Sequence, residues 1–406
     1  MGLIIQKFGG TSVRNPMSRE HAINQVEHAL RDGDQVVVVV SAMGRKGEPY
    51  ATDSLLELIQ YPQTAVSNRE VDLLASCGEI ISTVVFTHEL RKLGITAAAM
   101  TGPDAGFLTT SEYTNAKISK VNTSKLKEYM KVNEVVVVAG FQGKNEEGNI
   151  TTLGRGGSDT SAVALGAALG ADYVDIFTDV DGIKTADPLL VKEAKTIKAV
   201  TYHEIVHLAY QGTKVIHPRA VEIAMQEKIP LRVRSTYSEE EGTLVASKVD
   251  SSMDAHLKER LVTGIAYVAN ITQIKVLANK EPIQLHQEVL QQLAKAGISV
   301  DFFNIATEGL TFTVPNARLS EAVQIIEVLG YDVQLEEDCA KVSTVGAAIQ
   351  GVPGVASKVV NALAKHGIQI LQSADSHTTI WVLVKESELE TAVNALHDEF
   401  LSFNND

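Results

Sequence analysis

Unbroken apolar runs alternate with amphipathic stretches over residues 1–245. Four of the runs have the length and the Val/Ile content of buried strands: VVVVVSAM at 36–43, ITAAAMTG at 95–102, VVVVAGF at 135–141 and YVDIFTDV at 173–180. A strand that helices cover on both faces has no polar face, so its sequence does not alternate. The stretches 18–31 and 158–170 have helical periodicity and supply crossover helices between such strands. The pattern predicts an α/β domain built on a buried parallel sheet.

The C-terminal part of the chain repeats itself. The polar segment SKVDSSMDAHLKER indicates a linker, which we place at 246–262. Beyond it three segments recur, without gaps, at an offset of 70 residues: VLQQLAKAGISV at 289–300 as VVNALAKHGIQI at 359–370, LTFTV at 310–314 as IWVLV at 380–384, and LSEAV at 319–323 as LETAV at 389–393. Each copy reads strand, helix, strand, strand, helix, strand, which predicts two small α+β domains at 263–337 and 338–406.

Composition and charge narrow the class of protein. Apolar residues make up 45% of the chain, charged residues make up 21%, and no apolar run reaches the roughly 18 residues of a membrane span. The N-terminus has no basic region followed by a cleavage site, so we expect a cytoplasmic protein that has no membrane partner. A net charge of −14 opposes binding to polyanions, so nucleic acid is not an expected partner.

A glycine-rich segment near the N-terminus is the first candidate site. KFGGTSV at 7–13 follows a short apolar strand, and Gly9 and Gly10 would let backbone N–H groups approach an anion closely. Lys7 would place a compact positive charge beside a transferring phosphoryl group. A tight turn explains two glycines equally well, and the segment is not a Walker A motif.

Two further polar segments follow apolar runs. GRGGSDTSA at 154–162 leads into a helix, with Ser158 or Asp159 as its expected N-cap. Helix N-termini bind anions, and the planar guanidinium of Arg155 suits a carboxylate. FTDVDGIKTADP at 177–188 is a polar loop after the last strong strand, where α/β proteins commonly bind ligands. A capped helix with a surface arginine and a solvated loop are the alternatives.

HEIVH at 203–207 matches a short zinc-binding motif. H-E-x-x-H on a helix can place two zinc ligands on one face with a glutamate as base. Glu222 or Glu227 could supply a third ligand, although position 210 is Tyr rather than the glycine of the longer metzincin pattern. Short matches arise by chance, and the two histidines can equally be ordinary polar residues of a helix.

Taken together, the motifs resemble the aspartate kinases, specifically the short monofunctional form of Gram-positive bacteria. The matching segments are KFGGTSV at 7–13, VVVSAMG at 38–44, SCGE at 76–79, VAGFQG at 138–143, TTLGRGGSDTSA at 151–162, FTDVDGIKTADP at 177–188 and YQGTKVIHPRA at 210–220. The resemblance spans nearly the entire chain. It implies an amino-acid-kinase fold, a mainly parallel sheet sandwiched by helices, followed by two α+β ACT domains.

The resemblance also implies roles for individual residues. Lys7 and Asp159 correspond to catalytic positions, the aspartate as the residue that orients the lysines. The ATP-binding positions are Lys7, Phe8, Gly9, Gly10, Ser41, Thr178, Asp179, Lys184, Asp187 and Lys214. The aspartate-binding positions are Thr52, Glu79, Arg155, Gly156, Gly157 and Ser158. One position departs from the family, because Leu189 stands where many members have an arginine that reaches the nucleotide.

The expected reaction converts ATP and L-aspartate to 4-phospho-L-aspartate and ADP. A carboxylate nucleophile has an ordinary pKa of roughly 3.9, so it is ionised at neutral pH and needs no general base. Positioning, lysine charge and Mg²⁺ should therefore do most of the catalysis. We assign no metal ligands among the protein's side chains. The reaction is the first step of diaminopimelate, lysine, threonine and methionine biosynthesis.

The resemblance implies feedback regulation through the ACT domains and a homodimer or larger homo-oligomer formed by them. The expected effector-binding positions are Asp301, Gln369, Ile370, Ser376 and His377. SADSHTTI at 373–380 departs from the STSEI-like run of lysine- and threonine-sensitive relatives. We therefore prefer meso-diaminopimelate as the effector, with lysine or threonine possible.

Two other functions stay open at this point. A kinase for another acid, such as acetylglutamate, would share the glycine-rich turns but would not need Glu79 to meet a free ammonium. A sensor with an inactive kinase domain would show the same repeat, but it would not be expected to retain Lys7, Arg155, Asp159 and Lys214 together. Met253 lies near the linker and offers an internal start for a separate regulatory subunit, as in some relatives.

Overall fold

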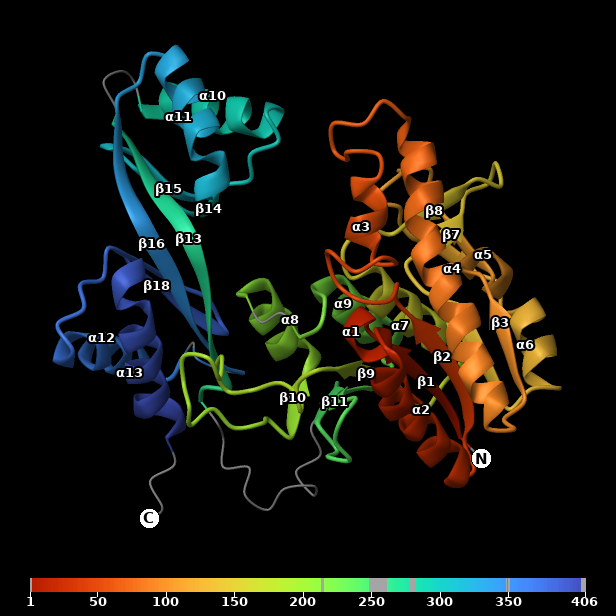
Figure 1. Ribbon diagram of the computed structural model, residues 1–406. Coiled ribbons are helices and arrows are strands. Elements are labelled where there is room, and N and C mark those ends of the chain that lie inside the picture. Colours follow the sequence, from red (N-terminus) through yellow and green to blue (C-terminus); the bar gives the residue numbers. More distant parts are fainter. Residues whose placement is uncertain are drawn as a thin grey trace. The chain divides into compact units, whose positions relative to one another are not determined.

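The computed structural model describes residues 2–212, 215–247, 261–277, 282–347, 349 and 351–402 (Figure 1). The chain forms two compact units. The first consists of Met1–Ile183, Thr196–Tyr210 and Lys214–Leu257. The second consists of Lys184–Lys195, Gln211–Thr213 and Lys258–Asp406. Most of the predicted linker, and Met253 within it, lies outside the described residues.

The first unit is built on one eight-stranded sheet. Its order is β10-β12-β11-β9-β1-β2-β6-β3, and the pairing of β11 with β12 is the one antiparallel pairing among its described strands. The strands are β1 (Leu3–Phe8), β2 (Gln35–Val40), β3 (Ala97–Met100), β6 (Val135–Ala139), β9 (Tyr173–Thr178), β10 (Ala199–Thr201), β11 (Leu231–Ser235) and β12 (Thr243–Ala246). The predicted parallel α/β sheet is confirmed. The apolar runs continue past the ends of their strands, as after β2, where Ala42 and Met43 are buried.

Helices cover both faces of this sheet. The helices of the first unit are α1 (Gly10–Val13), α2 (Pro16–Arg31), α3 (Thr52–Glu57), α4 (Asn68–Lys92), α5 (Gly102–Ala105), α6 (Ser124–Met130), α7 (Gly157–Leu169), α8 (Tyr202–Tyr210) and α9 (Pro218–Glu227). Val26 of α2 and Phe86 of α4 pack with Ile4 on one face. Gly166 of α7 lies against Ile5, whose side chain points to the other face. The helices therefore sandwich the sheet.

A smaller sheet accompanies the main one in the first unit. Its order is β5-β4-β7-β8, made of β4 (Phe107–Thr109), β5 (Ile118–Val121), β7 (Gln142–Lys144) and β8 (Ile150–Thr152). Helix α4 passes along it and contacts β8 (Figure 1). Among the described helices, α4 is the one long and apolar enough to cross a membrane, but 56% of its most apolar window is buried inside the protein. A core helix of this kind gives the same signal.

The second unit contains one six-stranded sheet in the order β14-β15-β13-β16-β18-β17. The strands are β13 (Gly264–Leu277), β14 (Asp301–Ala306), β15 (Gly309–Pro315), β16 (Val333–Val345), β17 (Gln372–Asp375) and β18 (Thr379–Lys385). Four α-helices accompany it, α10 (Pro282–Lys295), α11 (Leu319–Val328), α12 (Val355–Lys365) and α13 (Leu389–Leu401), as well as the short 3₁₀ turns η1 (Asn316–Arg318) and η2 (Glu386–Glu388). The pairings within the sheet are antiparallel, as the repeat predicts.

The two copies of the repeat share their strands. The second half of β13 pairs with β15 and the start of β16, and its first half pairs with the end of β16. The expected last strand of the second copy is therefore replaced by the first half of β13. This replacement is possible because β13 and β16 are 14 and 13 residues long, about twice the usual strand. The boundaries at 263, 337 and 338 stay a prediction.

A segment from the middle of the chain is built into the second unit. Ala186 and Val191 belong to the same buried apolar cluster as Leu396 of α13. The Thr185 hydroxyl lies 3.0 Å from Nε2 of His397, a residue whose pKa is lowered by burial. The residues that follow strand β9 in the sequence are thus part of the unit that contains the repeat.

Candidate active site

The ends of β1 and α7 are joined by an ion pair. Nζ of Lys7 lies 2.6 Å from Oδ1 of Asp159, and both side chains are mostly buried. Lys7 is the penultimate residue of β1, and Asp159 is in the first turn of α7. The two predicted catalytic residues are therefore in direct contact. An ion pair with this little exposure holds the lysine in one place.

The turn after β1 can be formed only by small residues. Gly9 precedes the short helix α1, and a Cβ on Gly10 would lie 2.6 Å from the carbonyl oxygen of Gly44. The same two residues are joined by a hydrogen bond from the Gly44 N–H to the Gly10 carbonyl, at 2.9 Å. Phe8 is buried and stacks on Phe177 of the neighbouring strand, with 4.8 Å between ring centroids. The ring of Phe8 is therefore part of the core beneath the turn, packed on Phe177.

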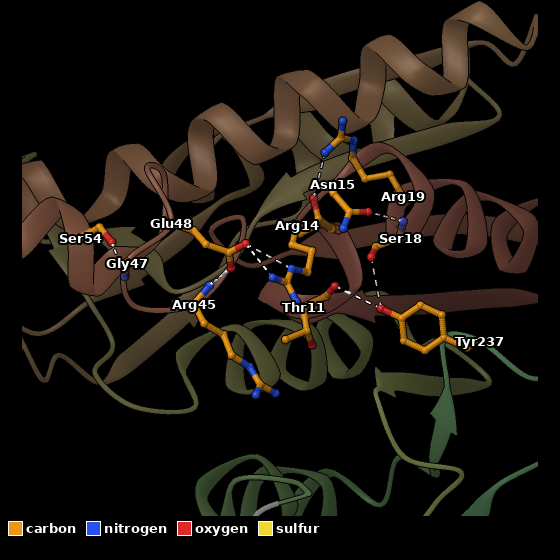
Figure 2. Close-up of polar contacts among 11 residues, drawn as sticks. Thr11, Arg14, Asn15, Ser18, Arg19, Arg45, Gly47, Glu48, Ser54 and Tyr237 are labelled. Carbon is orange, nitrogen blue, oxygen red and sulfur yellow. Dashed lines mark hydrogen bonds and ion pairs between the residues drawn. The ribbon is translucent and has the colours of Figure 1, made fainter.

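Polar contacts brace this turn from two sides (Figure 2). The Arg14 guanidinium donates to Glu48, which also accepts the backbone N–H of Arg45. On the other side the Tyr237 hydroxyl contacts the Thr11 carbonyl and the Ser18 hydroxyl. The loop after β2 and the loop after β11 are thereby fixed to the glycine turn.

Glu79 lies against the end of β2. Its Oε1 accepts the backbone N–H of Ala42 at 3.0 Å, and its Oε2 is buried without a hydrogen-bond partner among the described residues. The side chain is 2% exposed, and burial raises the pKa of its carboxyl to about 8, although the Ala42 N–H opposes the shift. Ser41, which precedes Ala42 in the turn after β2, donates its N–H to the Phe8 carbonyl. Glu79 therefore offers an unused acceptor beside the glycine turn.

The turn before α7 has two glycines in the left-handed conformation. Gly154 has φ 74° and Gly156 has φ 67°. Gly156, rather than the expected Ser158 or Asp159, is the N-cap of α7, and it offers no side chain. The N-cap prediction is wrong because both polar side chains already lie in the first helical turn, where Asp159 pairs with Lys7. Arg155 is exposed, and no ion pair is recorded for it among the described residues.

Strand β6 brings this turn next to β2. The Gly140 N–H, just after β6, donates to the Val40 carbonyl at the end of β2. A Cβ on Gly140 would lie 2.9 Å from Cβ of Ser158, so the first turn of α7 packs directly on this residue. Lys7, Asp159, Ser158 and Glu79 thus surround the carboxyl ends of neighbouring strands. This is the edge of a parallel sheet where ligands bind.

The end of β9 joins the same edge. The Thr178 carbonyl accepts the backbone N–H of Thr236 at 2.9 Å, and the Thr236 hydroxyl lies 2.7 Å from that of Ser12 in α1. Asp179 pairs with the Arg45 guanidinium at 2.8 Å, and both side chains are well exposed. The predicted nucleotide positions at 178 and 179 are therefore adjacent to the glycine turn.

Two predicted ATP-binding positions belong to the second unit, and a third lies outside the described residues. Lys184 and Asp187 belong to the second unit, where the Asp187 carboxylate accepts the Tyr267 hydroxyl at 3.0 Å. Leu189, in the same segment, is 88% exposed. Lys214 lies outside the described residues.

Thr52, a predicted aspartate-binding position, begins α3, which packs on α4. The roles of these residues stay predictions.

The expected effector-binding positions lie in the second unit. The Asp301 carboxylate, at the start of β14, is paired with the buried ammonium of Lys341. Gln369 and Ile370 lie between α12 and β17, beside Gln372, whose amide donates to the Phe302 carbonyl at 2.6 Å. Ser376 and His377 form the turn between β17 and β18, where the Ser376 hydroxyl accepts the Thr379 N–H. The first residues of β14 and β17, on opposite edges of the sheet, are thus in contact.

The H-E-x-x-H segment forms helix α8. The Glu204 carboxylate accepts the N–H and the hydroxyl of Thr201, so it caps its own helix. Among the residues that the structure describes, no group of three or more His, Cys, Asp or Glu side chains could hold a metal ion. The capping role explains the glutamate of the motif without zinc.

Several residues of the site were not singled out from the sequence. Arg45 pairs with Asp179, Asp72 is buried in α4, and His217 and Arg219 begin α9. The motif YQGTKVIHPRA contains the last two, so the resemblance was the available signal. Their contacts depend on chain segments far apart in the sequence, which no local pattern records.

Comparison with known proteins agrees with this arrangement. Residues 2–235 match the amino acid kinase family, and residues 334–398 match an ACT domain. Aspartokinase 1 of Bacillus subtilis is 56% identical over 400 residues, which cover 98% of this chain and 99% of the relative.

Solved structures agree with it as well. Aspartokinase III of E. coli in complex with aspartate and ADP has a TM-score of 0.78 at 26% identity, covering 98% of this chain and 100% of the other. The same enzyme in complex with lysine and aspartate has a TM-score of 0.75, at the same identity and coverage. The chain therefore belongs to the aspartokinase family, as an ATP-dependent kinase of the aspartate carboxyl group that carries ACT domains.

Proposed function

We propose that the chain converts ATP and L-aspartate to 4-phospho-L-aspartate and ADP as the first step of diaminopimelate, lysine, threonine and methionine biosynthesis. We further propose that an amino-acid end product regulates it through the second unit. Family membership and the geometry of the first unit support the reaction. The unused, buried oxygen of Glu79 is the observation that carries the choice of substrate.

Glu79 supports an amino acid with a free α-ammonium as the substrate. A buried carboxylate with one unpaired oxygen carries a desolvation cost that a bound ammonium offsets. Arg155 is the matching cation for a substrate carboxylate, because its guanidinium has two parallel donors. An N-acylated acid would present no charge to Glu79. The alternative of an acetylglutamate-type kinase is therefore disfavoured.

Lys7 is the residue proposed to stabilise the transferring phosphoryl group. Its ammonium is held by Asp159 at 2.6 Å, beside the backbone N–H groups of the glycine turn. The aspartate nucleophile is already ionised, so the proposed mechanism uses no general base. The rate then depends on positioning and on neutralising the charge of the transition state. Retention of this pair also argues against an inactive kinase domain.

Mg²⁺ is the proposed cofactor of ATP. A magnesium ion in such a site is held by phosphate oxygens and one or two carboxylates, and when bound it neutralises charge on the phosphates. The Asp179 carboxylate fits this requirement, because it is half-exposed at the end of β9 and its partner Arg45 is exposed as well. Asp179 would therefore hold the ion, with Arg45 released toward solvent or phosphate.

The second unit is the proposed sensor. Asp301 offers an exposed carboxylate, while its partner Lys341 is 4% exposed and has the opposite charge. Such a pair can bind both charges of a zwitterionic amino acid. We keep meso-diaminopimelate as the preferred effector, with lysine or threonine possible. The segment 184–195 connects this unit to the end of β9 through the chain itself.

We also propose a homodimer or larger homo-oligomer that forms through the ACT domains, in the cytoplasm. Strand β14 is an edge of the six-stranded sheet, and it carries Phe303 and Ile305 at 58% and 51% exposure. An exposed apolar edge strand is a template for pairing with a second copy.

The reaction and its regulation can be tested in one assay. The protein is supplied with ATP, Mg²⁺ and L-aspartate, and hydroxylamine traps the acyl phosphate as a hydroxamate. We expect aspartate-dependent hydroxamate that is suppressed by meso-diaminopimelate, and less by lysine or threonine. Trapping with another acid alone would overturn the substrate, no turnover with any acid would favour a sensor, and unchanged turnover with every end product would overturn the regulation.

Replacing Lys7 should affect the chemical step more than substrate binding. We expect Lys7→Ala to lower kcat by about 10²- to 10³-fold with little change in KM, because its charge acts on the transition state. Lys125→Ala is a matched control, since that lysine pairs with Asp104 on the surface. A Lys7→Ala variant with near-normal kcat would remove the residue from this role.

The Glu79 carboxyl predicts a pH dependence. Its pKa of about 8 in the free protein means that it is protonated at neutral pH and must lose this proton to accept an ammonium. We expect kcat/KM for aspartate to rise by up to about tenfold per pH unit between pH 6 and 7 and to level off near pH 8. In Glu79→Gln this rise should be absent and KM for aspartate high.

Glu204→Gln is the control for this experiment. Glu204 is also a buried glutamate of the first unit, but it caps α8. Its variant should keep the pH profile of the wild type. An unchanged profile in Glu79→Gln would contradict the proposed contact with the ammonium.

The proposed oligomer can be tested by sedimentation velocity. Phe303→Glu should convert the protein toward monomer, because a charge on the edge strand opposes pairing. Val360→Glu is the control, since Val360 is 50% exposed on α12, away from this edge. A monomeric wild type, or a Phe303→Glu variant of unchanged mass, would contradict the proposal.

A further inference from the structure

The turn of residues 153–157, which we propose to bind the substrate carboxylate, begins where two chain segments are hydrogen-bonded to each other. We call this contact between the two segments the bridge. The Ala116 N–H donates to the Thr152 carbonyl at 2.9 Å, which joins the loop before β5 to the end of β8. Leu153 then leads directly into Gly154 and Arg155. A Cβ on Gly154 would lie 3.0 Å from the Asn115 side chain and 3.1 Å from the Thr114 carbonyl, so the turn starts in contact with this bridge. Any shift of the bridge would move Arg155.

A buried anion holds the donors of the bridge. Asp72 of α4 is fully buried, and its carboxylate accepts the backbone N–H groups of Thr114 and Thr152 at 3.0 and 2.8 Å. It also accepts the Thr152 hydroxyl at 2.6 Å. Burial raises the pKa of Asp72, and these hydrogen bonds oppose the shift. Asp72 has no role in contacting substrate, because these protein groups occupy its oxygens.

Backbone carbonyls of the same two segments accept hydrogen bonds from Arg219. The Arg219 guanidinium donates from Nη1 to the Leu153 carbonyl at 2.9 Å and from Nη2 to the Ala116 carbonyl at 2.8 Å. Arg219 is the second residue of α9, so it connects that helix to both segments of the bridge. The planar guanidinium can donate to two carbonyls at once, which a lysine ammonium does with poorer geometry.

His217 completes the contact with the turn. It is the N-cap of α9, and its Nδ1 accepts the backbone N–H of Arg219 at 3.3 Å. A Cβ on Gly156 would lie only 2.1 Å from Cγ of the His217 ring. The ring is therefore packed on the backbone of Gly156, and the residues His217 and Arg219 hold opposite ends of the turn.

We propose that Arg219 is a positioning residue, which holds the turn of residues 153–157 in the shape that presents Arg155 to the carboxylate of the substrate. The inference rests on the proposed function of this turn in binding aspartate. The Arg219 guanidinium donates to protein carbonyls, and the proposed role needs no contact with substrate or nucleotide. It acts through two backbone carbonyls, so its loss should weaken the binding of the acid and leave the binding of ATP unchanged.

The first measurement is steady-state kinetics of Arg219→Gln and Arg219→Lys in the full chain. A misplaced binding group costs about 10- to 100-fold, so we expect Arg219→Gln to raise KM for aspartate by this factor. KM for ATP should stay at the wild-type value. Arg219→Lys, which can reach one carbonyl, should give an intermediate KM for aspartate. Equal increases in both KM values, or wild-type kinetics, would overturn the proposal.

The second measurement does not depend on the substrate. Trypsin cleaves after arginine, and Arg155 is exposed in the turn. We expect cleavage between Arg155 and Gly156 to be about tenfold faster in Arg219→Gln than in the wild type, because a loosened turn opens more often. Cleavage at the wild-type rate would overturn the proposal, even if the wild type proved to phosphorylate a different acid. Phosphorylation of a different acid by the wild type would overturn only the proposed substrate. The KM comparison would then be made with the acid that the protein accepts.

Arg91→Gln is the matched control for both measurements. Arg91 also donates from its guanidinium to a backbone carbonyl, that of Ala97 on the edge strand β3. The variant should keep both KM values and the wild-type rate of cleavage at Arg155. If Arg219→Gln fails to fold, Arg219→Lys carries the test, and a lysine variant identical to the wild type in KM and cleavage would overturn the proposal.

Discussion

The ion pair between Lys7 and Asp159 is the contact around which the first unit is arranged. It joins the end of β1 to the first turn of α7 at 2.6 Å, in a largely buried place. The glycine turn directly follows the lysine, and the turn of Arg155 directly precedes the aspartate. One ion pair therefore holds the glycine turn and the turn of Arg155, the proposed phosphate-binding and carboxylate-binding segments, next to each other. Removing either partner would leave an unpaired buried charge, which is costly.

The other buried carboxylates of the first unit fall into two groups according to how they are satisfied. Asp175 is paired with the Arg232 guanidinium at 2.6 and 2.8 Å, and Asp72 is surrounded by donors from the backbone and Thr152. These two stabilise the fold. Glu79 has only the Ala42 N–H, so one of its oxygens remains available. Buried polar groups are nearly always paired in proteins, and the exception therefore indicates where a ligand binds.

The second unit shows how a repeat in sequence becomes a single structure. Two copies placed end to end would leave open sheet edges, whereas the long strands β13 and β16 serve both copies at once. Ala186 and Val191 of segment 184–195 are buried in its core. Because this segment follows β9, whose end lies beside the glycine turn, the chain itself provides a covalent path between the second unit and the end of β9.

The sequence by itself determined the class of fold and the family, and it predicted the main site residues. Unbroken apolar runs predict parallel strands, since only a sheet covered on both faces buries such runs, and β2, β3, β6 and β9 follow them. Motif resemblance predicted roles for Lys7, Asp159, Glu79 and Arg155, whose charges complement those of ATP and aspartate, and these roles stay predictions. Only the tertiary structure decided that Gly156 is the N-cap of α7 and that β13 pairs with strands of both copies. It also decided that segment 184–195 packs in the second unit and that Arg219 holds the turn of Arg155. Local periodicity carries no record of such contacts, since each depends on backbone atoms that folding brings together rather than on the pattern of neighbouring side chains.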